Sequence, residues 1–448
     1  MSQTNIHDMT KGKIIQPLIG FTIPLVLGNL FQLTYNAADS VIVGKFVGEG
    51  ALAAVGTSAP IMNIAILLIS GMCMGASVLM SSQFGAGDYD TLSRQISTTM
   101  LAGCGFSALF SLMMVLMAKP VLMLIQVPGE VIPLAAAYLR IIYLGLIFTF
   151  LYNFLANTLR ALGDSKTPLY FLIISALLNV AGDILLVSIC RQGVIGSAVS
   201  TVLSEAACCL LCAVYIKRRI PLLCLGRKWL VFDKNLLGKT LSYGSTSAMQ
   251  QVCLQIGKII IQAVVNTQGV SVIAAFTAVN RVDDFAYTPQ QNIGHAMTTF
   301  LAQNKGAGEK ERMQKGFRCG LLIELVYSLF LSLFIFAAAP RIMQLFVEEG
   351  DARVVELGVA YLHLIAFMYV LPGMTNGIQG FFRGIGDMKI TLYSTFMNML
   401  GRVVAVCVML QVLQMEFASL AWANMVGWIV MLLFEVPLLL KSLRQWKR

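Results

Sequence analysis

Oxygen-bearing polar side chains recur one helical turn apart inside long apolar segments of the chain. Asp183 follows Asn179 by four positions, and Asn157 follows Asn153 at the same spacing. Because residues four apart share one face of an α-helix, each pair presents two such side chains to the same neighbouring helix. Further polar residues of this kind are Thr201 with Glu205, and Asp39 with Gln32, Tyr35 and Asn36.

If these segments cross a membrane, their polar groups have three possible uses. A carboxylate at bilayer depth costs at least about 2.5–3.5 kcal/mol, so each one needs a compensating role. Burial disfavours the charged form, so the carboxyl group can take up a proton near neutral pH and release it elsewhere. The same oxygens, with amide and hydroxyl oxygens beside them, can instead coordinate Na⁺, because hard cations take oxygen ligands. Hydrogen bonding between helices is the third use.

The composition places these segments in a membrane. The 448 residues are 57% hydrophobic and only 12% charged, with a mean hydropathy of +0.78. Soluble domains carry about 25% charged residues, so this chain has about half the usual supply. A large soluble enzyme, a disordered scaffold and a nucleic-acid-binding protein are therefore excluded, despite the net charge of +10.

Apolar runs between polar breaks predict twelve transmembrane helices, since a span needs about 20 residues. The runs are 14–42, 51–80, 95–118, 131–158, 168–188, 194–216, 240–265, 270–302, 318–339, 355–381, 390–412 and 417–440. Loops on the side of the termini carry 23 of the 32 Lys and Arg residues, and the opposite loops carry five. Both termini are therefore expected in the cytoplasm of a bacterial-type cell, with the chain crossing the cytoplasmic membrane many times.

The two halves of the chain repeat the same motifs. Arg160-Ala-Leu-Gly-Asp-Ser-Lys166 recurs 223 positions later as Arg383-Gly-Ile-Gly-Asp-Met-Lys389, and Gln83-Phe-Gly-Ala-Gly-Asp88 recurs as Gln303-Asn-Lys-Gly-Ala-Gly-Glu309. We therefore predict an all-α integral membrane protein with two six-helix lobes. Because six is even, a pseudo-two-fold axis along the membrane normal should relate the lobes. The expected boundaries are 1–216 for the N-lobe, 217–239 for a basic cytoplasmic linker and 240–448 for the C-lobe.

In order and spacing, these motifs resemble the multidrug and toxic compound extrusion (MATE) family over essentially the full chain. The residues that carry the resemblance are Pro24, Asp39, Ala51-Leu-Ala-Ala-Val-Gly56, Gln83 with Gly85-Ala-Gly87, the paired Arg-x-x-Gly-Asp loops and Asn280-Arg281-Val282. The resemblance implies a V-shaped pair of lobes that exports organic compounds in exchange for H⁺ or Na⁺.

In the DinF-like branch of that family, matching positions form a cation-binding network in the N-lobe. Carried over to this sequence, the network consists of Asp39, Asn153, Asn179, Asp183 and Thr201, with Pro24 as a conformational bend. Tyr138, Asn157, Tyr35 and Asn36 are its secondary candidates.

The second half departs from the NorM-like branch, which has carboxylates in spans seven and ten. Here span seven offers Gln250, Gln251, Gln255 and Lys258, and span ten offers His363 and Asn376. Asp283 and Asp284 remain as C-lobe alternatives, although Arg281 and Lys258 are expected to neutralise them. We therefore expect ion coupling in the N-lobe and structural roles for Glu324 and Glu435.

The predicted function is secondary active efflux of cationic or amphipathic organic compounds by alternating access. No Gly-x-x-x-x-Gly-Lys-Ser/Thr motif is present, so an H⁺ or Na⁺ gradient should drive transport. A lipid-linked oligosaccharide flippase is the alternative. We expect no enzymatic activity, no cofactor and no metal site, because the Cys208, Cys209 and Cys212 group lacks a nearby His. The expected partners are small organic substrates and the lipid bilayer, with no nucleic acid, and the chain should act as a monomer.

Overall fold

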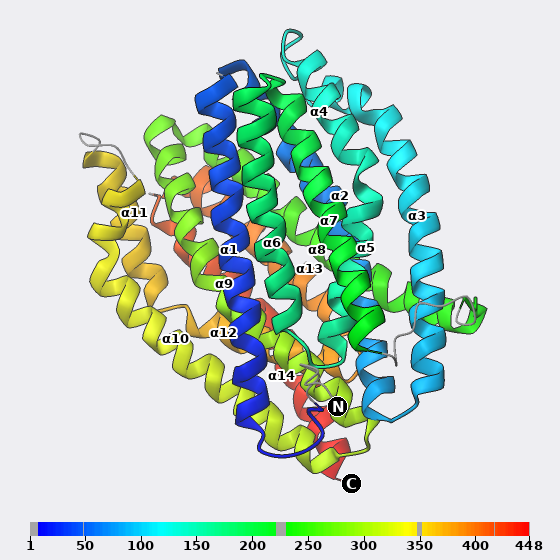
Figure 1. Ribbon diagram of the computed structural model, residues 1–448. Coiled ribbons are helices and arrows are strands. Elements are labelled where there is room, and N and C mark those ends of the chain that lie inside the picture. The colour runs from blue at the N-terminus through cyan, green and yellow to red at the C-terminus, as the bar shows by residue number, and fades with distance from the viewer. Residues whose placement is uncertain (1–7, 48, 221–229, 347–351, 416, 448) are drawn as a thin grey trace. The chain divides into compact units, whose positions relative to one another are not determined.

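Every regular element of the described chain is a helix, and no strand occurs in that part (Figure 1). The computed structural model describes residues 8–47, 49–220, 230–346, 352–415 and 417–447. Within the helices, the side chains of 36–46, 49–53, 346, 446 and 447 lie outside the described residues. Asp39 and Asn36 are among them, so only their place in a helix is given.

The helices follow one another in the order predicted from the apolar runs. Their bounds are α1 Ile15–Val47, α2 Glu49–Gly85, α3 Tyr89–Leu124, α4 Ile132–Leu144, α5 Leu146–Ala161, α6 Lys166–Asp183, η1 Ile184–Ile189, α7 Gly193–Arg219, α8 Lys234–Val265, η4 Asn266–Gln268, α9 Val270–Gly306, α10 Lys310–Phe346, α11 Ala352–Ala366, α12 Val370–Gly384, α13 Met388–Cys407, η5 Val408–Val412 and α14 Ser419–Lys447.

The membrane-spanning character predicted from the sequence is confirmed. Among the described residues, nine helices are long and apolar enough to cross a membrane, and the bent pairs α4–α5 and α11–α12 qualify as well. The remaining predicted span is α9, a single helix of 37 residues. It falls outside that set because charged and amide side chains, including Asp283, occupy its middle.

Two of the predicted spans are broken at their centres. The run predicted at 131–158 forms α4 and α5, which meet at an angle of 44°, and the run at 355–381 forms α11 and α12, which meet at 54°. At the first break, a Cβ on Gly145 would lie 2.5 Å from the Val202 side chain, so only glycine fits there. At the second, Pro372 lies in the first turn of α12, where its missing N–H needs no helical partner.

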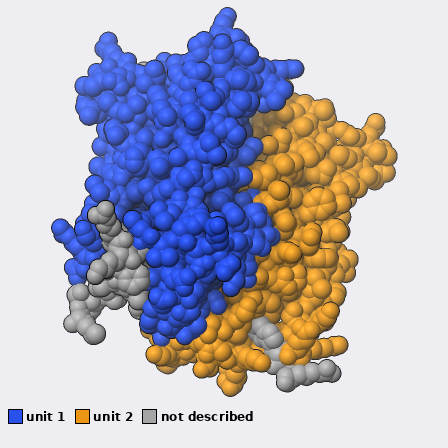
Figure 2. Space-filling view, turned by 90° about the vertical axis from the view of Figure 1, so that its right-hand side faces the viewer, with its two compact units in different colours: residues 1–8, 23–248 blue, residues 9–22, 249–448 orange. Residues whose placement is uncertain are grey.

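The chain forms two compact units, which Figure 2 shows in different colours. Unit 1 comprises Met1–Asp8 and Ile23–Ala248, and unit 2 comprises Met9–Thr22 and Met249–Arg448. The division therefore falls within α1 and α8, and not in the linker at 217–239. Within unit 1, α8 begins against α2, where a Cβ on Gly75 would collide with the Tyr243 backbone. Such small residues let membrane helices approach closely.

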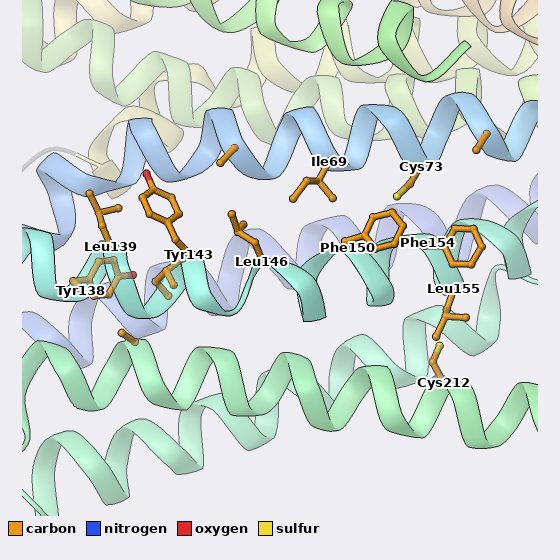
Figure 3. Close-up of a cluster of buried hydrophobic side chains, with 14 of the residues drawn as sticks. Ile69, Cys73, Tyr138, Leu139, Tyr143, Leu146, Phe150, Phe154, Leu155 and Cys212 are labelled. Atoms are coloured by element: carbon orange, nitrogen blue, oxygen red, sulfur yellow. The ribbon is translucent and has the colours of Figure 1, made fainter. Parts of the chain in front are cut away.

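Each unit has its own hydrophobic core. In unit 1 the stacked rings of Phe150 and Phe154 on α5 face Ile69 and Cys73 on α2, with ring centroids 5.8 Å apart (Figure 3). The core of unit 2 gathers the α9, α11 and α14 side chains around Tyr361 and Tyr369. These cores fix the helices that carry the polar residues described next.

Candidate functional site

In unit 1 the structure brings together Asn179 on α6 and Thr201 on α7. The Asn179 amide Nδ2 lies 3.1 Å from Thr201 Oγ1 and 3.5 Å from Ser200 Oγ, and Ser200 Oγ donates to the Asn179 carbonyl at 2.8 Å. The two helices approach this closely because Gly182 has no side chain to collide with Ser200. Two residues named for the N-lobe network, Asn179 and Thr201, are thus in contact, and Ser200 is a partner that the sequence patterns did not indicate.

Asp183 is completely buried at the last residue of α6. It lies four residues after Asn179, so the two side chains share a helical face, as their spacing predicts. The chain continues from Asp183 into the π-helix η1, which has a wider turn than an α-helix. Such turns are rare in proteins, and where they occur they are often at functional sites. In the second half, α13 passes into the π-helix η5 in the same way.

A second polar connection links α5 to α7. Thr149 Oγ1 donates to Glu205 Oε2, which places a half-buried carboxyl group beside the α4–α5 break. The predicted candidates Asn153 and Asn157 donate instead to backbone carbonyls of their own helix, at Thr149 and Asn153, both at 2.8 Å. The structure therefore shows them bound to α5 itself, and the link to the neighbouring helix comes from Thr149 and Glu205.

The other N-half candidates lie on α1 and α4. Tyr138 is buried on α4 within the hydrophobic core of unit 1 (Figure 3). Tyr35 is half-buried on α1, whereas the side chains of Asp39 and Asn36 lie outside the described residues. Pro24 lies inside α1, two residues beyond Thr22, where the helix passes from unit 2 to unit 1. Proline removes one helical hydrogen bond at this position.

In unit 2 a cluster of tyrosines binds Asp283. Tyr369 donates its hydroxyl to Asp283 Oδ1 at 2.8 Å, and Tyr361 donates to Oδ2 at 3.0 Å. Asn424 in turn donates to the Tyr361 hydroxyl at 2.8 Å. Both carboxyl oxygens of Asp283 therefore accept hydrogen bonds from tyrosine hydroxyls.

The neighbouring acid Asp284 has a different environment. Lys258 Nζ lies 3.5 Å from Asp284 Oδ1, with both side chains about half exposed, and Arg281 is exposed. Lys258 therefore pairs with Asp284 and not with Asp283, whose carboxyl oxygens accept hydrogen bonds from tyrosine hydroxyls. Successive residues on a helix point about 100° apart, so one acid faces the core and the other does not.

Two members of the cluster around Asp283, Tyr361 and Asn424, occupy the repeat positions of candidate residues in unit 1. The spacing of 223 that relates the Arg-x-x-Gly-Asp loops also relates Tyr138 to Tyr361, Asn179 to Arg402 and Thr201 to Asn424. The acids of the two units do not correspond. The repeat counterpart of Asp183 is Val406, whereas Asp283 lies on α9. Alignment of the two halves at this spacing would have indicated Tyr361 and Asn424 from the sequence.

Other polar residues from the sequence analysis lie inside the units. Gln250 donates to Gln379 Oε1 at 3.1 Å and to Thr395 Oγ1 at 3.0 Å, which joins α8, α12 and α13. Glu324 and Glu435 are completely buried. Cys208 donates its thiol hydrogen to the Phe171 carbonyl, while Cys212 packs in the hydrophobic core (Figure 3).

Comparison with known proteins accounts for the doubled sequence. The profile of the MatE family matches residues 24–185 and again residues 247–409. The two matches begin 223 positions apart, which is the spacing of the paired loops and of the paired polar residues. The repeat predicted from a few motifs therefore extends over most of each half.

Relatives and solved structures agree with this assignment. The probable multidrug resistance protein YpnP of Bacillus subtilis (strain 168) is 32% identical over 385 residues, or 85% of each chain. The probable multidrug resistance protein NorM of Thermotoga maritima is 23% identical over 430 residues, covering 93% of this chain and 90% of that protein.

Two solved structures share the fold over the whole length of both chains. One is a MOP superfamily transporter from Pyrococcus furiosus, with a TM-score of 0.91 at 21% identity. The other is an outward-facing multidrug resistance MATE family transporter, with a TM-score of 0.90 at 20% identity. The chain therefore belongs to the MatE family, and it is a membrane transporter and not an enzyme.

Proposed function

We propose that this chain exports small organic compounds and exchanges them for H⁺ or Na⁺ through alternating access. The observation that carries the proposal is the buried polar face of unit 1, where Asp183, Asn179 and Thr201 gather on α6 and α7 of a MatE-family chain. Relatives at 32% and 29% identity are named as probable multidrug resistance proteins, which supports drug-like substrates.

The proposed coupling group is Asp183, acting together with Asp39 of α1. A fully buried carboxyl group either binds a proton or needs a cation, because an isolated charge is costly inside the bilayer. The amide and hydroxyl oxygens of Asn179 and Thr201 supply neutral ligands beside it, and such oxygens suit Na⁺. Pro24, where α1 passes between units, is the proposed bend, and no cofactor is required.

The proposed orientation places both termini in the cytoplasm of a bacterial-type cell. Its basis is the excess of Lys and Arg in the loops on the side of the termini. We further propose that one chain suffices for transport, since the doubled sequence supplies both halves of the transporter.

Efflux from cells and from vesicles tests the function. In a strain lacking its own pumps, the unmutated chain should confer drug resistance, and Asp183→Asn should abolish it while expression and membrane insertion persist. Asparagine keeps the shape of the protonated acid but cannot release a proton. Asp284→Asn is the matched control, because that acid is half exposed and bound to Lys258.

Vesicles with an imposed H⁺ or Na⁺ gradient then identify the coupling ion. Drug uptake driven by only one of the gradients assigns that ion. Full resistance with Asp183→Asn would refute the role of this carboxyl group. Export of a lipid-linked sugar without any drug transport would favour a flippase instead.

A further inference from the structure

Glu324 on α10 is a buried carboxyl group whose surroundings offer it no hydrogen-bond donor. Its side chain is completely buried, and neither Oε1 nor Oε2 has a hydrogen-bond partner among the described residues. Gln290 on α9 is also completely buried, and its Oε1 likewise lacks a partner there. Both residues belong to unit 2 and lie outside the cluster around Asp283.

The two side chains meet at Gly373 on α12. A Cβ placed on Gly373 would lie 2.4 Å from Ser328 Oγ, 3.3 Å from Gln290 Nε2 and 3.5 Å from Glu324 Oε2. The side chain of Glu324 also approaches Gly377, one turn further along α12. The glycines therefore let α12 pack closely against α9 and α10, where carboxyl, amide and hydroxyl groups converge.

The polar hydrogens of Gln290 and Ser328 are already used. Gln290 Nε2 donates one hydrogen to Ser328 Oγ at 3.0 Å and the other to the Tyr369 carbonyl at 2.9 Å. This second contact fixes the amide orientation, because a carbonyl can only accept. The Ser328 hydroxyl donates to the backbone carbonyl of Glu324 at 2.6 Å, and so has no hydrogen left for the carboxyl group.

Two tyrosines of this region, Tyr327 and Tyr369, also donate to other groups. Tyr327, on the same helix as Glu324, donates to the Ala286 carbonyl at 3.1 Å, and Tyr369 donates to Asp283. Two charged groups on the packed helices act on other residues: Asp283 accepts from its tyrosines, and the charge of Arg383 on α12 acts on Glu435. His295 of α9 also has an interaction of its own.

Among the described residues a Glu324 carboxylate has no donor, whereas a carboxylic acid needs only an acceptor. A buried, unpaired carboxylate is costly, whereas the protonated group is neutral and carries a hydroxyl that can itself donate a hydrogen bond. The Gln290 side chain approaches the same glycine, and its Oε1 lacks a donor among the described residues. We propose that Glu324, with Gln290 and Ser328, forms a second proton-binding site of this transporter, located in unit 2.

The site gives the C-terminal half a protonatable group of its own. Opening the contact between α10 and α12 would expose Glu324 to water, where the carboxyl group ionises and the proton is released. Its use in antiport rests on the proposed function, whereas the binding of the proton does not. The measurements below separate the two.

Infrared spectroscopy of the purified full-length protein detects the proton directly. The carbonyl absorption of a protonated, buried carboxylic acid should be present at neutral pH and absent in Glu324→Gln. Glu356→Gln is the control, because this acid is exposed on α11 and paired with Arg353. An absorption unchanged by Glu324→Gln would overturn the proposal.

A second measurement needs no variant and covers the case in which Glu324→Gln does not fold. Apolar carbodiimides react with protonated carboxyl groups, so mass spectrometry should find Glu324 modified at neutral pH and protected at alkaline pH. Protection by Na⁺ at constant pH, without protection by alkali, would overturn the proposal in favour of a cation site.

Drug transport in vesicles then tests the use of the proton. Proton-driven uptake should be lost or reduced in Glu324→Gln and kept in Glu356→Gln, whose acid is exposed on α11. Undiminished transport by Glu324→Gln would overturn the coupling role. Failure of drug transport by the unmutated chain, with Glu324 still modified, would refute the proposed function but leave the proton site in place.

Discussion

Removal of the Tyr361 hydroxyl should destabilise unit 2 through two lost hydrogen bonds. Tyr361→Phe deletes the bond to Asp283 Oδ2 at 3.0 Å and the bond from Asn424 Nδ2 at 2.8 Å. The ring stays in place, so packing against Phe417 is kept. The change therefore isolates the polar contribution of the hydroxyl group.

The membrane environment decides the size of the effect. A hydrogen bond to a charged group contributes about 1.5–3 kcal/mol in soluble proteins. Between membrane helices, side-chain hydrogen bonds average about 0.6 kcal/mol and reach about 1.7 kcal/mol, because unfolded helices in the bilayer find other partners. Two lost bonds should therefore lower the free energy of unfolding by about 1–3 kcal/mol.

Tyr287→Phe is the matched control within the same cluster. Its hydroxyl is buried without a hydrogen-bond partner in the described part of the chain, and its ring contacts Tyr369 and Trp428 edge-on. Loss of an unpartnered hydroxyl should leave stability unchanged or raise it slightly. Both variants are compared by unfolding of the purified protein in detergent. Equal destabilisation by the two variants, or none by Tyr361→Phe, would refute the contribution of these two hydrogen bonds to the stability of unit 2.

Two further predictions concern the ends of the helices. Single cysteines at exposed positions near the helix ends should be labelled from opposite sides of the membrane. Lys166 and Lys389 should be labelled from inside, and Arg191 and Arg341 from outside. Labelling of the first pair from outside would contradict the proposed orientation. Arg312→Ala should release the segment before α1, because Arg312 donates to the carbonyls of Met9, Lys11 and Gly12 at 3.1, 2.8 and 2.6 Å. A loss of about 1–2 kcal/mol in the free energy of opening this segment would speed its amide hydrogen exchange roughly 5- to 30-fold. Unchanged exchange would show that the bonds of Met9 to Gln303 and Asn304 are enough to hold it.

The sequence alone predicted the features that depend on local pattern. Apolar runs of membrane-spanning length appear as helices or bent helix pairs, and motifs 223 positions apart revealed the repeat that the family profile confirms. The four-residue spacing also placed Asn179 and Asp183 on one face of α6. Each of these inferences needs only the helical period and the thickness of a bilayer.

The tertiary structure decided which partner each polar side chain has. Asp283 and Asp284 are adjacent in sequence, yet the packing of α9 turns one toward the tyrosines and the other toward Lys258. The sequence suggested a structural role for Glu324, whereas its neighbours in the fold have no hydrogen to donate to it.

The same holds for the places where helices bend or change units. The breaks at Gly145 and before Pro372, and the division of α1 and α8 between units, depend on which helices touch. A helical pattern specifies which face is polar. The group that meets that face comes from a distant part of the chain, so it is fixed only when the helices pack.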